Sequence, residues 1–171
     1  MIGMTRPAFP APAPKWVVEE GVAVALGVPA GDTGRAMSQE NVEVVKRAWE
    51  AWSSGDVDAV LATCDPAVEL DMTRFEGWPE DDVYYGHEGF RRFLEEWRAS
   101  WDRFETRAEH YVDGEDDRVV VLCWQRGFGV GSQVPVKMDM ATTFMLERGL
   151  ICRIEAYSDR QEALEAVALR E

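Results

Sequence analysis

The sequence of 171 residues is 46% hydrophobic and 29% charged, and it carries a net charge of −14 at pH 7. This composition is typical of a globular domain, and the negative charge argues against nucleic acid or anionic lipid as a partner, because phosphate groups are bound by clustered Lys and Arg. No apolar run is long enough to span a bilayer, and three widely spaced cysteines without a C-x-x-C pair predict a reducing, cytoplasmic location.

Residues 1–36 differ in composition from the rest of the chain. Prolines alternate with alanine and phenylalanine near the start, and Gly and Pro interrupt residues 27–34. Such a segment buries too little apolar surface to offset the entropy lost on ordering. We therefore expect a disordered leader over residues 1–36 and a folded domain over residues 37–171. Ser38 is the predicted helix N-cap, and the pair Met37-Ser38 is typical of a natural start, which leaves a mis-assigned start codon open.

Hydrophobic periodicity predicts the order of helices and strands. Apolar residues at spacings of three and four indicate helices, alternation indicates strands, and clusters of Gly, Pro and Asp indicate connections. Gly55 and Asp56 are typical of a helix stop followed by the cap of the next helix. Helices followed by a run of strands predict an α+β fold with a mostly antiparallel sheet. In chain order we first expect helices over 38–54 and 57–64, a strand over 67–73 and a loop over 74–85. A helix from Gly86 or His87, with an apolar stripe that reaches Trp101, is expected next. Strands over 104–112, 118–128, 134–147 and 150–157 should follow, and Asp159 should cap a closing helix that runs to Leu169.

Four motifs stand at characteristic places in this order. They are AWSSGDVD at 51–58, Asp65-Pro66, GHEGFRRF at 86–93 and YSD at 157–159. Together with the order of elements they resemble the nuclear transport factor 2-like superfamily, and within it the SnoaL-like proteins, over about residues 37–169.

The resemblance implies a cone-shaped half-barrel, in which a curved sheet wraps around about three N-terminal helices and a short helix closes the chain. It also implies a pocket at the wide end and a homodimer through the outer face of the sheet. The superfamily includes polyketide cyclases, ketosteroid isomerase, epoxide hydrolases and members without any chemistry. Fold alone therefore does not decide the activity.

Asp71 is the first candidate for catalysis. The resemblance places it near the carboxylate that ketosteroid isomerases use as general base. A carboxylate that faces an apolar cavity has a raised pKa, which improves it as a base near neutral pH. The alternative is that Glu69, Asp71 and Thr73 form the solvated face of a half-buried strand, and the simple alternation favours this alternative.

Other positions depart from the catalytic patterns of the family. Ala48 stands where the isomerase has its oxyanion tyrosine, and Thr142 stands near the position of its protonated aspartate. Ile154 and Ala156 stand where the SnoaL-like cyclases have His and the acid/base Asp. These positions therefore match neither the catalytic residues of the isomerases nor those of the SnoaL-like cyclases.

His87 is the second catalytic candidate, as an acid/base group at the pocket rim, because the pKa of free histidine lies close to neutrality. The alternative is that His87 hydrogen-bonds the backbone and fixes the turn before the helix. His110 is expected at the surface or an interface. No H-x-x-x-H or clustered carboxylate spacing predicts a metal, and no cofactor is expected.

Aromatic and thioether side chains are predicted to line the pocket. Alternation over residues 134–144 gives one apolar face, suited to a flat hydrophobic ligand, and an opposite mixed face that could contact a second subunit. Two functions stay open. The first is an enzyme without cofactor that catalyses proton transfer, isomerisation or cyclisation with Asp71 as general base, or that has a hydrolase-like activity. The second is a non-catalytic module that binds a hydrophobic ligand or serves as a dimeric interaction domain. In either case the expected partners are a small hydrophobic molecule and a second copy of the chain. The predicted lining residues are Trp49, Trp52, Phe90, Trp97, Met138, Met140, Thr142 and Phe144.

Overall fold

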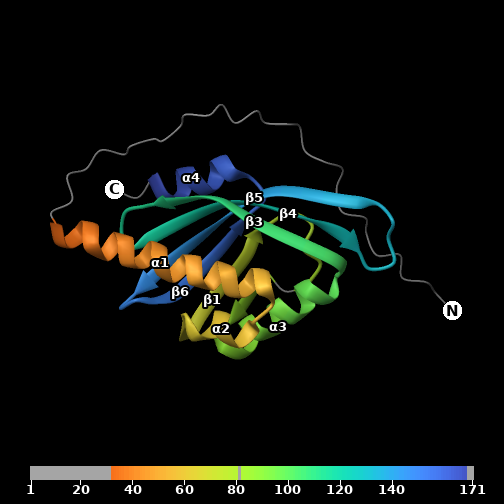
Figure 1. Ribbon diagram of the computed structural model, residues 1–171, viewed down its shortest axis with the longest axis horizontal. Helices are drawn as coiled ribbons and strands as arrows, with labels where there is room; N and C mark the ends of the chain where they lie inside the picture. Colours follow the sequence, from red (N-terminus) through yellow and green to blue (C-terminus); the bar gives the residue numbers. More distant parts are fainter. Residues whose placement is uncertain (1–31, 81, 169–171) are drawn as a thin grey trace.

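A computed structural model describes residues 32–80 and 82–168 of the chain (Figure 1). Most of the predicted leader, residues 1–31, lies outside the described residues. The elements in chain order are α1 (Asp32–Ser54), α2 (Val57–Ala62), β1 (Cys64–Arg74), β2 (Val83–Tyr85), α3 (Gly86–Ala99), β3 (Trp101–Asp113), β4 (Arg118–Gly129), β5 (Pro135–Glu147), β6 (Leu150–Tyr157) and α4 (Arg160–Ala168).

The six strands form one sheet in the order β2-β1-β6-β5-β4-β3. β1 and β6 pair in parallel, and every other neighbouring pair is antiparallel. Figure 1 shows a curved sheet with α1, α2 and α3 against one face and α4 against the other. The predicted α+β cone, with its short C-terminal helix, is confirmed.

The main core lies between the sheet and the first three helices. On α3, Phe90, Phe93, Leu94 and Trp97 are all buried. Their spacings of three and four put them on one face of the helix. Burial of each such side chain stabilises the fold by about 1.5–3 kcal/mol, so this face fixes α3 against the sheet.

A smaller core lies under α4 on the outer face of the sheet. Ala163 and Val167 of α4 pack there with Val120 and Ala141 of the sheet. This helix therefore covers part of the outer face that the family resemblance assigns to a dimer contact. The homodimer stays a prediction.

The start of α1 differs from the prediction. Ser38 lies inside the helix instead of capping it, because the helix begins at Asp32. The Ser38 hydroxyl donates a hydrogen bond to the carboxylate of Asp113, and Asn41 Nδ2 donates to Asp117 Oδ1 over 2.9 Å. These two polar residues therefore join α1 to the end of β3 and the turn after it. The domain boundary predicted after residue 36 falls within α1.

Two other expectations about the elements were wrong. The stretch predicted as a loop, 74–85, contains the short strand β2, which pairs with β1 at Glu69↔Tyr85. Three residues are too few for alternation to be visible in the sequence. Trp101, predicted on the helix stripe, begins β3, although its ring still lies 6.0 Å from that of Trp97 between centroids.

The predicted stop of the first helix and the predicted cap of the second are confirmed. Gly55 has a φ of +81°, a conformation that glycine adopts without strain. Asp56 Oδ1 accepts a hydrogen bond of 3.0 Å from Ala59 N and so caps α2.

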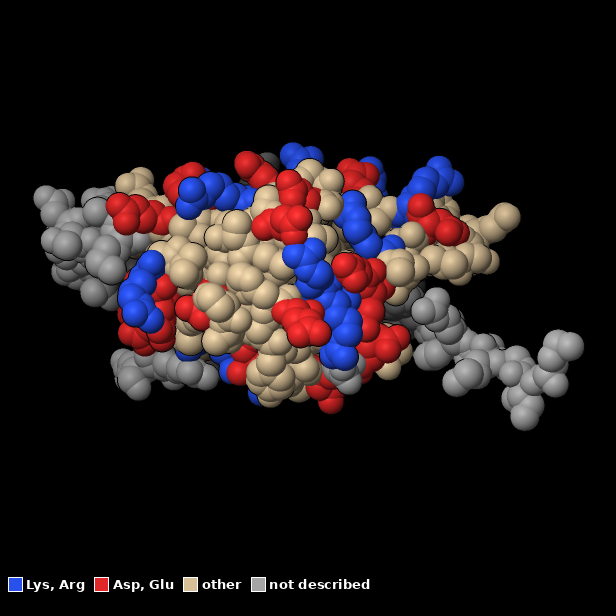
Figure 2. Space-filling view, turned by 90° about the horizontal axis from the view of Figure 1, so that it is seen from below, with Lys and Arg blue, Asp and Glu red and all other residues tan. Residues whose placement is uncertain are grey.

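The helical face of the molecule carries charges of both signs. Figure 2 shows Asp and Glu side chains interspersed with Lys and Arg around an uncharged central area. A continuous basic surface for phosphate groups is therefore not present on this face. Among the described helices, none combines the length and apolar character needed to cross a membrane.

Candidate functional site

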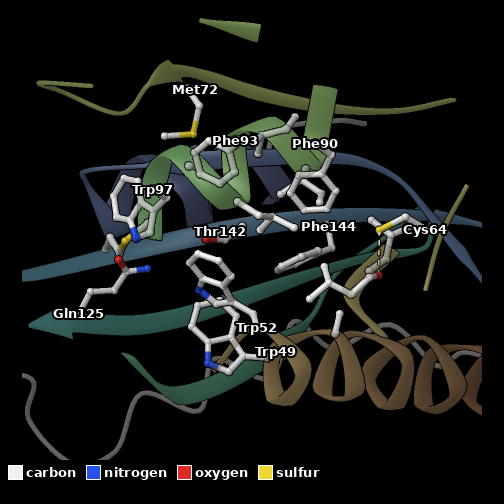
Figure 3. A pocket seen from close by; sticks show the side chains of 18 residues that line it. Trp49, Trp52, Cys64, Met72, Phe90, Phe93, Trp97, Gln125, Thr142 and Phe144 are labelled. Carbon is white, nitrogen blue, oxygen red and sulfur yellow. Dashed lines mark hydrogen bonds between the residues drawn. The ribbon is translucent and has the colours of Figure 1, made fainter. Parts of the chain in front are cut away.

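A cavity of about 80 Å³ lies between the helices and the inner face of the sheet (Figure 3). Its walls come from α1, α2, β1, α3, β4, β5 and β6, so it is formed only when the whole cone is folded. The lining residues are Ala48, Trp49, Trp52, Val60, Cys64, Leu70, Met72, Phe90, Phe93, Leu94, Trp97, Gln125, Met140, Thr142, Phe144, Ile151, Ile154 and Ala156.

The periodicity of each element explains why these side chains converge. On α1, Trp49 and Trp52 are three residues apart and lie on the same helical face. On β5, Met140, Thr142 and Phe144 alternate, so all three point to the inner face of the sheet. The cavity is therefore bounded by aromatic rings on the helical side and by thioether and aromatic groups on the sheet side.

The wall is almost entirely apolar, with a few polar atoms. Gln125 is 4% exposed, Thr142 7%, Trp49 7% and Trp97 1%. Among the described residues, Trp49 Nε1, Trp97 Nε1 and Gln125 Oε1 have no hydrogen-bonding partner. None of the lining residues is Asp, Glu, His, Lys or Arg. A guest in this cavity would meet hydrogen-bonding groups but no charge.

The one thiol in the wall is not a reactive group. Burial raises the pKa of Cys64 to about 11, against a smaller opposing effect of its hydrogen bond with Thr63. Cys64 Sγ also lies 3.5 Å from the carbonyl oxygen of Val60, to which it donates. Because the thiolate is the nucleophile, Cys64 does not supply one near neutral pH.

Thiol labelling at pH 8 should modify Cys152 before the other two cysteines. Cys152 is half-buried, whereas Cys64 and Cys123 are buried. Burial raises the pKa of Cys123 to about 12, so the two buried thiols stay both protonated and shielded at pH 8. Mass spectrometry after timed reaction with iodoacetamide gives the order of modification. Earlier labelling of Cys64 would contradict the burial of the cavity wall.

Asp71 lies on the face of β1 opposite the cavity. Its neighbours Leu70 and Met72 line the cavity, whereas Asp71 does not. Leu70 and Met72 are two residues apart on β1 and therefore share one face of the strand. The Asp71 carboxylate accepts hydrogen bonds from Thr73 N over 2.9 Å and from Arg153 Nη2 over 3.0 Å. The expectation of a base inside the cavity does not fit this geometry.

Arg153 explains the position of this carboxylate. Its guanidinium also contacts Glu69 Oε1 at 2.5 Å and Glu155 Oε1 at 3.2 Å. One cation on β6 thus pairs with three half-buried carboxylates on the outer face of the sheet. Asp71 belongs to this charged cluster, and the solvated-face alternative describes Glu69 and Asp71 better than a pocket base does.

His87 also lies outside the cavity wall. Its Nε2 is 3.1 Å from the carbonyl oxygen of Cys64. A carbonyl only accepts, so Nε2 carries the hydrogen and donates it. This contact joins the start of α3 to the start of β1. It agrees with the alternative in which His87 hydrogen-bonds the backbone instead of acting as an acid or base. His110 is exposed on β3, and the described residues contain no group of three or more His, Cys, Asp or Glu that could hold a metal.

The structure brings most of the predicted lining residues together. Met138 is the exception, because it lies in a second, open groove that follows β5 and shares Met140 with the cavity. The prediction did not include Gln125. The sequence did contain the information needed to find it. Gln125 follows Val121 and Cys123 at alternate positions of β4, so the alternation places a polar residue on an otherwise apolar face.

Comparison with known proteins gives a consistent result for the fold. The sequence model of the SnoaL-like domain matches residues 45–154. No curated protein sequence matches the chain.

Several solved structures are similar. The crystal structure of TerC with polyporic acid is 19% identical, with a TM-score of 0.63, over 75% of this chain and 97% of TerC. An NTF2-like protein from Burkholderia xenovorans LB400 is 22% identical, with a TM-score of 0.58, over 75% of this chain and 96% of that one. SalBIII, described as an epoxide hydrolase/cyclase-like enzyme in pyran ring formation of salinomycin, is 18% identical, with a TM-score of 0.59, over 72% of this chain and 93% of SalBIII.

Proposed function

Because the chain belongs to the SnoaL-like domain family, we propose that it binds a small, uncharged, mainly apolar ring compound in the inner cavity. The observation that carries this proposal is the composition of the cavity wall, which combines aromatic, thioether and aliphatic side chains with no charged group. Sites for small molecules are typically apolar with a few polar atoms that fix orientation.

The size of the cavity favours a single ring. An engineered apolar cavity of about 150 Å³ binds benzene, and the cavity here measures about 80 Å³. Met72 and Met140 lie in its wall, and their unbranched thioether chains change rotamer readily. A guest of benzene size therefore requires only local adjustment of these side chains.

The geometry supports binding in preference to proton transfer by Asp71. Asp71 pairs with Arg153 on the opposite face of the sheet, and His87 donates to a backbone carbonyl. A general base must come within hydrogen-bonding reach of the proton that it removes. TerC was crystallised with polyporic acid, which supports a ligand-binding cavity in this fold without assigning that ligand to this chain.

An Ala156→Leu substitution should weaken the binding of fluorobenzene by on the order of 30-fold, which corresponds to about 2 kcal/mol. Ala156 is buried on β6 and lines the cavity, so the added carbons occupy the space of the guest. Dissociation constants from fluorine NMR of the ligand, titrated with the full chain, measure the change.

Asp71→Asn is the matched control, because Asp71 lies outside the cavity wall. Its fluorobenzene affinity should equal that of the unchanged protein. The proposal would be wrong if the unchanged protein did not bind fluorobenzene, or if Ala156→Leu bound it equally well while remaining folded.

A further inference from the structure

One end of the inner cavity carries a hydrogen-bond donor and an acceptor that have no partners among the described residues. They are Trp97 Nε1 on α3 and Gln125 Oε1 on β4. Both side chains are more than nine-tenths buried. Figure 3 shows the indole nitrogen of Trp97 and the amide of Gln125 directed toward one another at the same end of the cavity. Buried polar atoms in native proteins are normally paired, so this pair of atoms indicates a polar guest group.

The chemistry of the two atoms specifies that group. An indole N–H only donates, and an amide oxygen only accepts. A hydroxyl group does both, since it accepts through its oxygen and donates through its hydrogen. A hydroxyl between Trp97 and Gln125 would therefore satisfy both atoms at once, whereas a carbonyl or ether oxygen would satisfy only the indole.

We propose that the Trp97–Gln125 end of the cavity binds the hydroxyl group of a neutral ring compound of the phenol or enol class. This inference rests on the proposed function, which requires that the cavity admits a small ring. It adds a selection rule: a hydroxylated ring binds better than the same ring without the hydroxyl group.

The same wall selects against anions. A carboxylate in this cavity would lose its hydration and find no Lys, Arg or His among the lining residues. Burial of an ionised group without a counter-charge is strongly unfavourable. A benzoate should therefore bind far more weakly than the phenol of equal ring size, even though both offer oxygen atoms.

Three fluorinated probes test this selection: fluorobenzene, 4-fluorophenol and 4-fluorobenzoate, titrated with the full chain at pH 7 and followed by fluorine NMR. The unchanged protein should bind 4-fluorophenol about tenfold more tightly than fluorobenzene, as expected for well-placed hydrogen bonds, and should not measurably bind 4-fluorobenzoate. A cavity without polar partners would give the reverse order for the first two probes, because a buried hydroxyl without a hydrogen bond is unfavourable.

Gln125→Met tests the residue assignment, because Met has nearly the same size as Gln and no amide. This variant should bind 4-fluorophenol no more tightly than fluorobenzene, so the readout is the ratio of the two affinities in the same variant. Trp97→Phe, which removes only the indole donor and part of the ring, should reduce the preference as well. Gln133→Met, at an exposed position between β4 and β5, is the control and should leave all three affinities unchanged.

The outcomes separate this inference from the proposed function. Failure of both fluorobenzene and 4-fluorophenol to bind overturns both. Binding of both with equal affinity, or a preference for 4-fluorophenol that persists in Gln125→Met, overturns the hydroxyl site and leaves the ligand cavity standing. Tight binding of 4-fluorobenzoate overturns the selection for neutral guests.

Discussion

Replacement of Trp97 by alanine should lower the free energy of unfolding by about 3–5 kcal/mol, the range found for large aromatic side chains in protein cores. Trp97 is almost completely buried, and its ring lies among other rings, with centroid distances of 5.1 Å to Trp78, 5.5 Å to Phe75 and 5.8 Å to Phe93. The substitution removes these contacts and leaves a space that the surrounding strands and helices cannot fill completely. Urea unfolding followed by circular dichroism measures the loss.

Two further measurements test whether the loss of stability comes from the missing ring of Trp97. Trp97→Phe keeps one aromatic ring and should lose less than half as much stability as Trp97→Ala. Indole added to Trp97→Ala should raise its stability in a concentration-dependent way, because a ligand that binds only the folded state stabilises it. A loss below about 1 kcal/mol in Trp97→Ala, the ordinary effect of a point substitution, would contradict a central position of this ring.

The position of Trp97 could be predicted from the sequence, because it depends on a local pattern. Phe90, Phe93, Leu94 and Trp97 repeat with the period of a helix, and one face of a helix beside a sheet must be buried. The same reasoning predicted the alternating inner residues Met140, Thr142 and Phe144 of β5. Periodicity therefore identified most of the side chains that surround the cavity.

The same alternation places Asp71 on the outer face of the strand, whereas the family resemblance suggested a position inside the pocket. Alternation groups Asp71 with Glu69, on the face opposite Leu70 and Met72, and a shift of one residue would move Asp71 to the inner face. An alignment that tolerates such a shift cannot decide between the faces. The partner that stabilises the outer position, Arg153, lies 82 residues further along the chain, so no local pattern indicated it.

The polar end of the cavity depends on contacts between distant elements. Trp97 and Gln125 belong to α3 and β4, and only the folded sheet brings them to the same end of the cavity. Alternation shows that Gln125 points inward, but it does not show which helix faces it. For the same reason the bonds of Ser38 and Asn41 to the far end of β3 and its turn were not predicted.

Replacement of Gly127 by alanine should lower the free energy of unfolding by about 3 kcal/mol, the upper part of the range for overpacked positions. A Cβ atom at Gly127 would overlap the carbonyl oxygen of Arg103 and lie 2.8 Å from Cε3 of Trp101. The register of β3 against β4 shifts between Trp101 and Arg103, which brings the backbone of β3 close to Gly127. A glycine in a strand often marks such a close approach of another backbone.

Gly129→Ala is the matched control for this prediction. Gly129 lies on the same strand, and a Cβ atom there would meet nothing closer than 3.9 Å, at Ser100 O and the Ser132 side chain. Its unfolding midpoint in urea should stay close to that of the unchanged protein. Because Trp101 packs on Trp97, Gly127→Ala should also weaken the binding of fluorobenzene in the adjoining cavity. Equal stability of the two alanine variants would contradict the close approach of β3 to Gly127. It would also contradict the expected effect of Gly127→Ala on the cavity through Trp101 and Trp97.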